Sequence, residues 1–236
     1  MILASASPRR AELLARVVYP FDVVPAALDE QRLPGESPRE HVRRLARDKA
    51  LHVSRAASSA RVLGSDTIVV RDDEILGKPA DELDAARMLA SLSGRSHQVL
   101  TALAWARDGE VSAEATSCSE VEFRELGDAE IAAYVASGEP RDKAGAYAIQ
   151  GGAAPFVRRV RGSVTGVIGL PLEELRALAE RLALPAPVTP LPAEAIALRL
   201  RATLGEVAAA SVASGRPPGS VRVVAVSKGH PAAAIA

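Results

Sequence analysis

The strongest constraint on the fold is a pair of long β-forming stretches, 97–106 and 110–123, joined by Asp108-Gly109. An Asp-Gly pair between two such stretches is typical of a two-residue β-hairpin, because both central positions of that turn need a positive φ. The two stretches are therefore predicted to be antiparallel neighbours in one sheet.

Shorter strands and separate helices surround this hairpin. Further strands are predicted at 1–3, 21–24, 61–70 and 156–161. Helices are predicted from Pro8 onward and at 38–57, 81–92, 128–137 and 171–184, with a loop at 162–169. The helix at 38–57 opens on a capping box, Ser37-Pro38-Arg39-Glu40. This mixture predicts an α/β (mixed α+β) layer fold, with a largely antiparallel, twisted sheet flanked by helices.

Composition bounds the size of the core and the class of partner. The 236 residues are 48% hydrophobic, which is enough for one core of about 180 residues with an appendage. Lysine plus arginine and aspartate plus glutamate both number 29, and the chain holds three Phe, three Tyr and one Trp. Without a positive net charge or an aromatic platform, the chain is not expected to bind nucleic acid.

Cysteine and histidine show no metal-binding spacing. A single cysteine forms neither an intramolecular disulfide nor a cysteine-based zinc site, so Cys118 is interpreted as a half-buried strand residue. The histidines, interpreted as surface or half-buried residues, are His41, His52, His97 and His230. No apolar run approaches the ~18 residues that span a membrane, and folded sequence starts at once, so a cytoplasmic protein without membrane contact is expected.

The first ten residues, MILASASPRR, predict a short strand, a turn of small residues and a helix start. Ser7 is the expected N-cap and Pro8 the first helical residue. Arg9 and Arg10 then oppose the helix dipole, which is understandable if an anion such as a triphosphate normally lies there. The alternative is a solvated helix start whose arginines pair with surface carboxylates.

Acidic and basic residues elsewhere would suit phosphoryl chemistry. Asp66 lies inside the otherwise apolar run RVLGSDTIVV, and Glu30 lies in a loop. Lys49 lies on a predicted helix, and Lys78 stands between glycine and proline in ILGKP. Cations neutralise phosphate oxygens, while carboxylates hold Mg²⁺ or orient a water. The alternatives are an aspartate bound to backbone N–H groups, a solvated helix lysine and an ordinary turn.

Five motifs follow one another in an order that is characteristic of one protein family: SASPRRAELL, GSDTIV, LGKP, DKAGAYAIQG, and GLPL near residue 170. Through them the chain closely resembles the Maf family of nucleoside triphosphate pyrophosphatases, over about residues 1–184. The resemblance implies a Maf/ITPase-like fold. It also implies a house-cleaning enzyme that cleaves a nucleoside triphosphate between its α and β phosphates, giving the monophosphate and pyrophosphate with Mg²⁺ or Mn²⁺.

The resemblance also implies roles for the phosphate-binding and catalytic residues. Ser5, Arg9 and Arg10 would hold the phosphates from the first loop. Glu30 and Asp66 would serve the metal and the attacking water, with Asp66 as the general base.

The remaining residues would balance charge and select the base. Lys49 and Lys78 would neutralise charge on the triphosphate, and Gln150 would meet the base. The segment AYAIQG resembles the branch of the family that takes dTTP and UTP. The amide of Gln150 would suit such a base, because an amide both donates and accepts hydrogen bonds, as a pyrimidine edge requires. Gly166 departs from the asparagine common in that branch.

Beyond residue 184 the composition of the sequence changes. Residues 185–192 form a proline-rich linker, and 193–236 resemble the opening helix and strand of the pyridoxal-phosphate homeostasis proteins. Lys228 stands where those proteins carry the cofactor. Because the rest of such a barrel is missing, 193–236 is expected to be a truncated fragment and pyridoxal phosphate is not expected on this chain.

Two other functions compete with the enzyme. The domain at 1–184 would alternatively be a nucleotide-binding regulator of cell division and septum formation without significant turnover. The chain would otherwise carry pyridoxal phosphate through Lys228. The expected partner is a nucleoside triphosphate, and a homodimer is left open.

Overall fold

The computed structural model describes residues 1–17, 21–57, 59–184 and 217. Within these residues one seven-stranded sheet runs in the order β2-β1-β3-β5-β6-β7, with β4 beside β3. The strands are β1 (Ile2–Ala4), β2 (Asp22–Val23), β3 (Val62–Arg71), β4 (Glu74–Leu76), β5 (Ser96–Arg107), β6 (Glu110–Phe123) and β7 (Val157–Arg161). Strand β1 is parallel to β2 and β3, and the other pairings are antiparallel. The prediction of a mixed, largely antiparallel sheet is confirmed.

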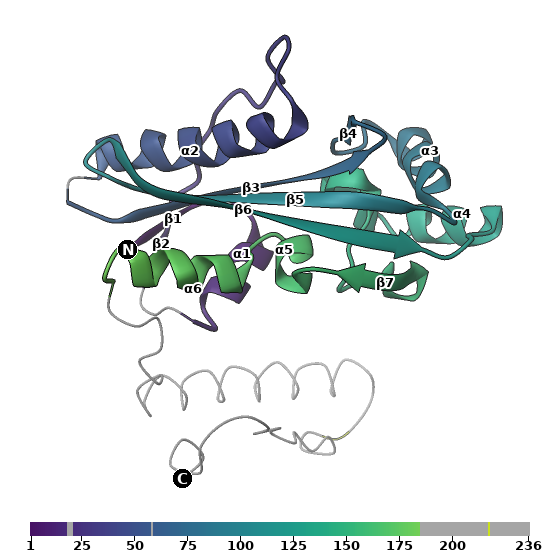
Figure 1. The fold of residues 1–236 in the computed structure, drawn as a ribbon. Coiled ribbons are helices and arrows are strands. Elements are labelled where there is room, and N and C mark those ends of the chain that lie inside the picture. Colours follow the sequence, from purple (N-terminus) through teal and green to yellow (C-terminus); the bar gives the residue numbers. More distant parts are fainter. Residues whose placement is uncertain (18–20, 58, 185–216, 218–236) are drawn as a thin grey trace. The chain divides into compact units, whose positions relative to one another are not determined.

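The long hairpin of β5 and β6 forms the centre of the sheet (Figure 1). Its turn residues Asp108 and Gly109 have φ values of 52° and 80°, as the two-residue hairpin turn requires. Asp72 and Asp73, with φ values of 50° and 65°, join β3 to β4 in the same way. Asp-Asp is a weaker hairpin signal than Asp-Gly.

Helix α2 (Pro38–Ala56) covers one face of the sheet, across β3 and β5 (Figure 1). Its start has the predicted capping box between Ser37 and Glu40. Gly64 of β3 permits the close approach, because a Cβ there would lie 2.2 Å from the carbonyl oxygen of Ala46 and 2.7 Å from the nitrogen of Ala50. This contact fixes which residues of α2 and β3 face each other.

The other helices lie on the opposite face and at one end of the sheet (Figure 1). Helices α1 (Pro8–Leu14), α5 (Val164–Ile168) and α6 (Leu172–Arg181) lie on the face opposite α2. Helices α3 (Glu82–Leu92) and α4 (Asp128–Ala136) pack together at the end of the sheet, near three 3-10 turns, η1 (Glu139–Asp142), η2 (Ala144–Ala146) and η3 (Ala154–Phe156). Aromatic rings of Phe123, Tyr134, Tyr147 and Phe156 fill the core there.

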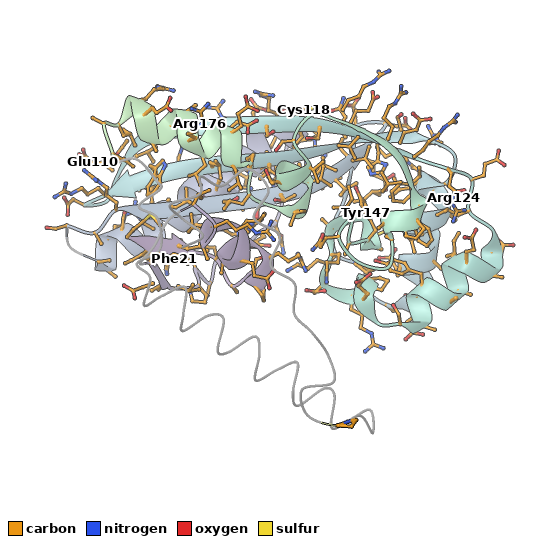
Figure 2. The ribbon with its side chains drawn as sticks, turned by 90° about the horizontal axis from the view of Figure 1, so that it is seen from below. Phe21, Glu110, Cys118, Arg124, Tyr147 and Arg176 are labelled. Carbon is orange, nitrogen blue, oxygen red and sulfur yellow. The ribbon has the colours of Figure 1, made fainter. Side chains whose placement is uncertain are left out.

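Three expectations about local structure are wrong. Residues 162–169, expected as a loop, contain α5, because Ser163 caps that helix and accepts a hydrogen bond from the nitrogen of Gly166 at 2.9 Å. Cys118 lies in β6, as expected, but it is exposed rather than half-buried (Figure 2). His41 and His97 are buried, at 5% and 3% exposure.

The predictions for the tail, including Lys228, fall outside the described residues. Within the described part of the chain, no helix combines the length and apolar character needed to cross a membrane.

Candidate active site

A cavity of about 530 Å³ opens beside β1, β3 and α2, and all eight residues singled out in the sequence line it. They come from six separate parts of the chain. The eight are Ser5, Arg9, Arg10, Glu30, Lys49, Asp66, Lys78 and Gln150. The fold therefore brings every sequence-predicted site residue to one place.

The centre of the cavity is a lysine between two carboxylates. Lys49 Nζ donates to Asp66 Oδ1 at 2.6 Å and lies 2.6 Å from Glu30 Oε1. The side chains of Lys49 and Asp66 are 8% and 9% exposed, whereas that of Glu30 is 47% exposed. Lys49 is thus no solvated helix lysine, and in the described residues Asp66 pairs with a buried cation.

The position of this lysine follows from the packing of α2 on β3. Lys49 stands in α2 between Ala46 and Ala50, the two residues that approach Gly64 most closely. Asp66 is two residues beyond Gly64 and so points to the same face of the strand. The glycine contact therefore brings the lysine and the aspartate together.

Opposing effects set the charge of Glu30. Partial burial raises the pKa of its carboxyl, but the hydrogen bond from Lys49 and the charges of Lys49, Lys78 and Arg10 outweigh burial, so the pKa lies below its usual value. Glu30 is therefore an anion at neutral pH, held by cations that also face the cavity.

Arg10 is bound mainly to the protein itself. Its guanidinium donates to the carbonyl oxygen of Gly169 at 2.9 Å, to Ser5 Oγ at 3.1 Å and to Thr67 Oγ1 at 3.0 Å. Burial lowers the pKa of Arg10, and the nearby Asp66 opposes that effect. A guanidinium has five N–H groups, so two have no partner among the described residues and remain for a ligand. Arg10 ties α1 to β3 and to the end of α5.

Ser5 and Arg9 differ in their availability to a ligand. Ser5 is 5% exposed, and its hydroxyl accepts from the nitrogen of Ser7 at 3.2 Å as well as from Arg10. Arg9 lies 3.6 Å from Asp142, whose side chain is 66% exposed. This is the carboxylate pairing that the alternative interpretation expected. So loose and exposed a pair is weak, and a phosphate would displace the carboxylate readily.

Lys78 and Gln150 reach the cavity from two loops that touch each other. Both residues are exposed. The nitrogen of Gly145 donates to the carbonyl oxygen of Gly77 at 3.0 Å, which links the Lys78 loop to the segment carrying Gln150. These two side chains therefore stand at the mouth of the cavity.

Several polar lining residues were missed in the sequence, among them His41, Thr67, Lys143 and Tyr147. Lys143 is the most informative, because its side chain is 12% exposed and its ammonium contacts Asp142 and, at 3.3 Å, the carbonyl oxygen of Glu139. Lys143 and Tyr147 stand in the DKAGAYAIQG motif, and Thr67 follows Asp66, so motif membership was the available signal. His41 is a buried residue of helix α2, and no motif in the sequence indicated that it would line the cavity.

The donor set would suit a hard divalent cation shared with a ligand. The described residues hold no cluster of three or more His, Cys, Asp or Glu side chains placed to bind a metal. Glu30 and Asp66, each 2.6 Å from Lys49, offer two carboxylates. Mg²⁺ commonly takes one or two carboxylates and completes its shell with phosphate and water oxygens, so the residues fit such an ion.

Comparison with known proteins places these residues in a family context. The family model of the Maf-like protein matches residues 1–182. A protein named dTTP/UTP pyrophosphatase from Anaeromyxobacter dehalogenans is 52% identical over 190 residues, covering 79% of this chain and 96% of its own. One of the same name from Geobacter sulfurreducens is 52% identical over 178 residues, covering 74% and 92%. A solved HAM1 protein from Coxiella burnetii is 18% identical, covering 76% and 98%, with a TM-score of 0.43.

Proposed function

Because this chain belongs to the family of Maf-like proteins, we propose that it is a nucleoside triphosphate pyrophosphatase that hydrolyses dTTP and UTP to the monophosphate and pyrophosphate. The observation that carries the proposal is the single cavity in which Lys49 holds Asp66 and Glu30, with further cations around it. The names of the relatives, about half identical over nearly their whole length, supply the two nucleotides.

Asp66 is assigned the general base. It is buried at the floor of the cavity and lies on a strand, so its carboxylate is held in one place. A water attacking the α phosphorus must lose a proton, and a fixed carboxylate within hydrogen-bond reach would accept it. Lys49 donates to this carboxylate and would also face the charge that builds on the phosphate.

Glu30 and Asp66 are the residues that would hold Mg²⁺ or Mn²⁺. When bound, such an ion would neutralise phosphate oxygens and help to orient the water. Glu30 is suited to a shared ligand, because its half-exposed side chain stays within reach of the solvent side of the cavity.

The cations at the rim are assigned to the β and γ phosphates. Arg9, Lys78 and Lys143 all line the cavity and come from three different segments. Arg10 contributes its two remaining N–H groups and keeps the first loop in shape through Gly169 and Thr67. Phosphate recognition would thus be divided between cations at the rim and the Arg10 guanidinium, which is held by three hydrogen bonds.

Gln150 is assigned the role of binding the hydrogen-bonding edge of the base. It lies in the same cavity as the phosphate-binding residues, on the loop that follows Lys143. Its amide would donate to and accept from the pyrimidine edge, whereas a carboxylate would only accept.

The test is release of pyrophosphate from a panel of triphosphates with Mg²⁺ or Mn²⁺ present. We expect pyrophosphate from dTTP and UTP and none from the corresponding diphosphates. Tight binding of dTTP without pyrophosphate would contradict the enzyme and favour the nucleotide-binding regulator. A cytoplasmic location, a homodimer and a role in septum formation stay predictions.

A further inference from the structure

Two side chains that do not line the cavity accept hydrogen bonds from the backbone of the loop that carries Gln150. The nitrogen of Ala148 donates to Tyr134 Oη at 3.0 Å, and the nitrogen of Gly152 donates to Glu139 Oε2 at 2.9 Å. One contact is two residues before Gln150 and the other two residues after it. Tyr134 and Glu139 thus bracket the residue assigned to the base.

The backbone of the loop lies directly against the Glu139 carboxylate. A Cβ at Gly151 would lie 2.0 Å from Glu139 Oε1, and a Cβ at Gly152 would lie 3.1 Å from the ring of Tyr134. A residue with a Cβ at Gly151 would force the Glu139 carboxylate away from its present place against the loop. The paired glycines that end AYAIQGG are therefore explained by contact with these two side chains.

The two supporting side chains are electrostatically coupled. Burial and the neighbouring Glu139 carboxylate raise the pKa of Tyr134, so its hydroxyl stays neutral. The neutral hydroxyl accepts from the nitrogen of Ala148 and keeps its own proton.

Both supporting side chains are anchored in packed elements. Tyr134 lies on α4, is 6% exposed and packs edge to face with Phe156, with ring centroids 5.3 Å apart. Glu139 begins η1, directly after Gly138, whose φ of 75° turns the chain at the end of α4. The loop thus receives its shape from the core rather than from its own exposed residues.

We propose that Tyr134 and Glu139 are positioning residues that set base selectivity, because they fix the backbone on both sides of Gln150. The inference rests on the proposed function, in which Gln150 meets the base. An exposed amide discriminates between bases only when its backbone is held to within about 0.5 Å. Neither side chain touches the substrate, and each acts through the loop.

The experiment compares kcat/KM for dTTP and UTP with that for dCTP and CTP in the wild type and in Tyr134→Phe, Glu139→Ala and Glu139→Gln. Tyr134→Phe and Glu139→Ala are expected to lower the selectivity for dTTP and UTP over dCTP and CTP about tenfold, mainly through KM, because the loop loses one support. Glu139→Gln keeps an acceptor for Gly152 and should stay within about threefold of the wild type.

The matched control is Glu130→Ala. Glu130 is a carboxylate of α4; it binds Arg124 and the nitrogen of Gly127 and makes no hydrogen bond to residues 147–152. Its loss should lower the melting temperature and leave the selectivity ratio unchanged. Unchanged selectivity in both Tyr134→Phe and Glu139→Ala would overturn the inference.

Amide hydrogen exchange separates this inference from the proposed function. Tyr134→Phe should speed exchange at Ala148 and Glu139→Ala at Gly152, whether or not any triphosphate is cleaved. Absence of pyrophosphate with the wild type would count against the proposed function alone. Wild-type exchange rates at both amides in the variants would refute the positioning role.

Discussion

The two halves of the cavity are built in different ways. Asp66 and Lys49 lie on β3 and α2, with side chains 9% and 8% exposed. Glu30, Lys78 and Gln150 lie in loops and are exposed. The difference teaches that packed secondary structure places Asp66 and Lys49, the groups assigned to proton transfer, whereas a few polar contacts place the three loop residues.

The loop of Glu30 shows how such a contact works. Glu36 accepts from Arg44 Nε at 2.7 Å, from Arg44 Nη2 at 3.0 Å and from the nitrogen of Leu33 at 3.1 Å, and lies 3.1 Å from His41 Nδ1. Arg44 also donates to the carbonyl oxygen of Gln31 at 2.9 Å. This clamp fastens the loop to α2, with little apolar burial beside it.

The largest effect on activity is expected at the packed half. Asp66→Asn should lower kcat by about 10²–10³-fold, or about 3 to 4 kcal/mol of transition-state stabilisation, because the amide cannot accept the proton. Asp142→Asn is the control, since that carboxylate is 66% exposed at the rim. Pyrophosphate release at saturating dTTP measures both, and full activity of Asp66→Asn would refute the assignment of the base.

The packing beneath Asp66 is tested by Gly64→Ala. The new methyl group would lie 2.2 Å from the carbonyl oxygen of Ala46, so α2 must move off β3. The free energy of unfolding should fall by about 1–3 kcal/mol. Gly77→Ala is the matched control, because a Cβ at Gly77 meets nothing within 4 Å, and urea unfolding should show a change within about 0.5 kcal/mol.

Substitutions in the loop half of the cavity should weaken substrate binding and leave the stability of the fold unchanged. Lys78→Met removes an exposed cation of the cavity mouth and should raise KM for dTTP about tenfold, worth about 1.4 kcal/mol, with an unchanged melting temperature. Steady-state kinetics with dTTP and a thermal melt of the same sample give both values. A lowered melting temperature would mean that this loop supports the core.

The smallest effect is expected from Glu36→Gln. The hydrogen bond from Arg44 is the main cause that lowers the pKa of Glu36 from 4.5 to about 2. The resulting stability is present above pH 4.5 and is lost as pH falls through about 2. At pH 7 the variant should lose about 1 kcal/mol or less, since the pair is partly solvated.

The pH dependence supplies the check on that clamp. Unfolding free energies of the wild type and Glu36→Gln should converge between pH 5 and about pH 2, as the carboxyl takes up its proton. A constant difference over that range would mean that the charge of Glu36 contributes nothing to the clamp.

Local features of the fold were predictable from the sequence because they depend on neighbouring residues. The capping box at Ser37 and Glu40 and the turn at Asp108 and Gly109 involve positions one to three residues apart. Helix α5 escaped prediction because it is only five residues long, and its cap at Ser163 stands among small residues and glycines that are typical of loops.

The sequence by itself determined most of the elements and eight of the residues around the cavity, since these were readable from short motifs and their order. Only the tertiary structure decided what those residues do to one another. Lys49 joins Asp66 because a glycine lets α2 approach β3, and Arg10 meets Gly169, which is 159 residues away. Such pairings arise from the packing of distant segments, and no local pattern encodes which buried charge will face which.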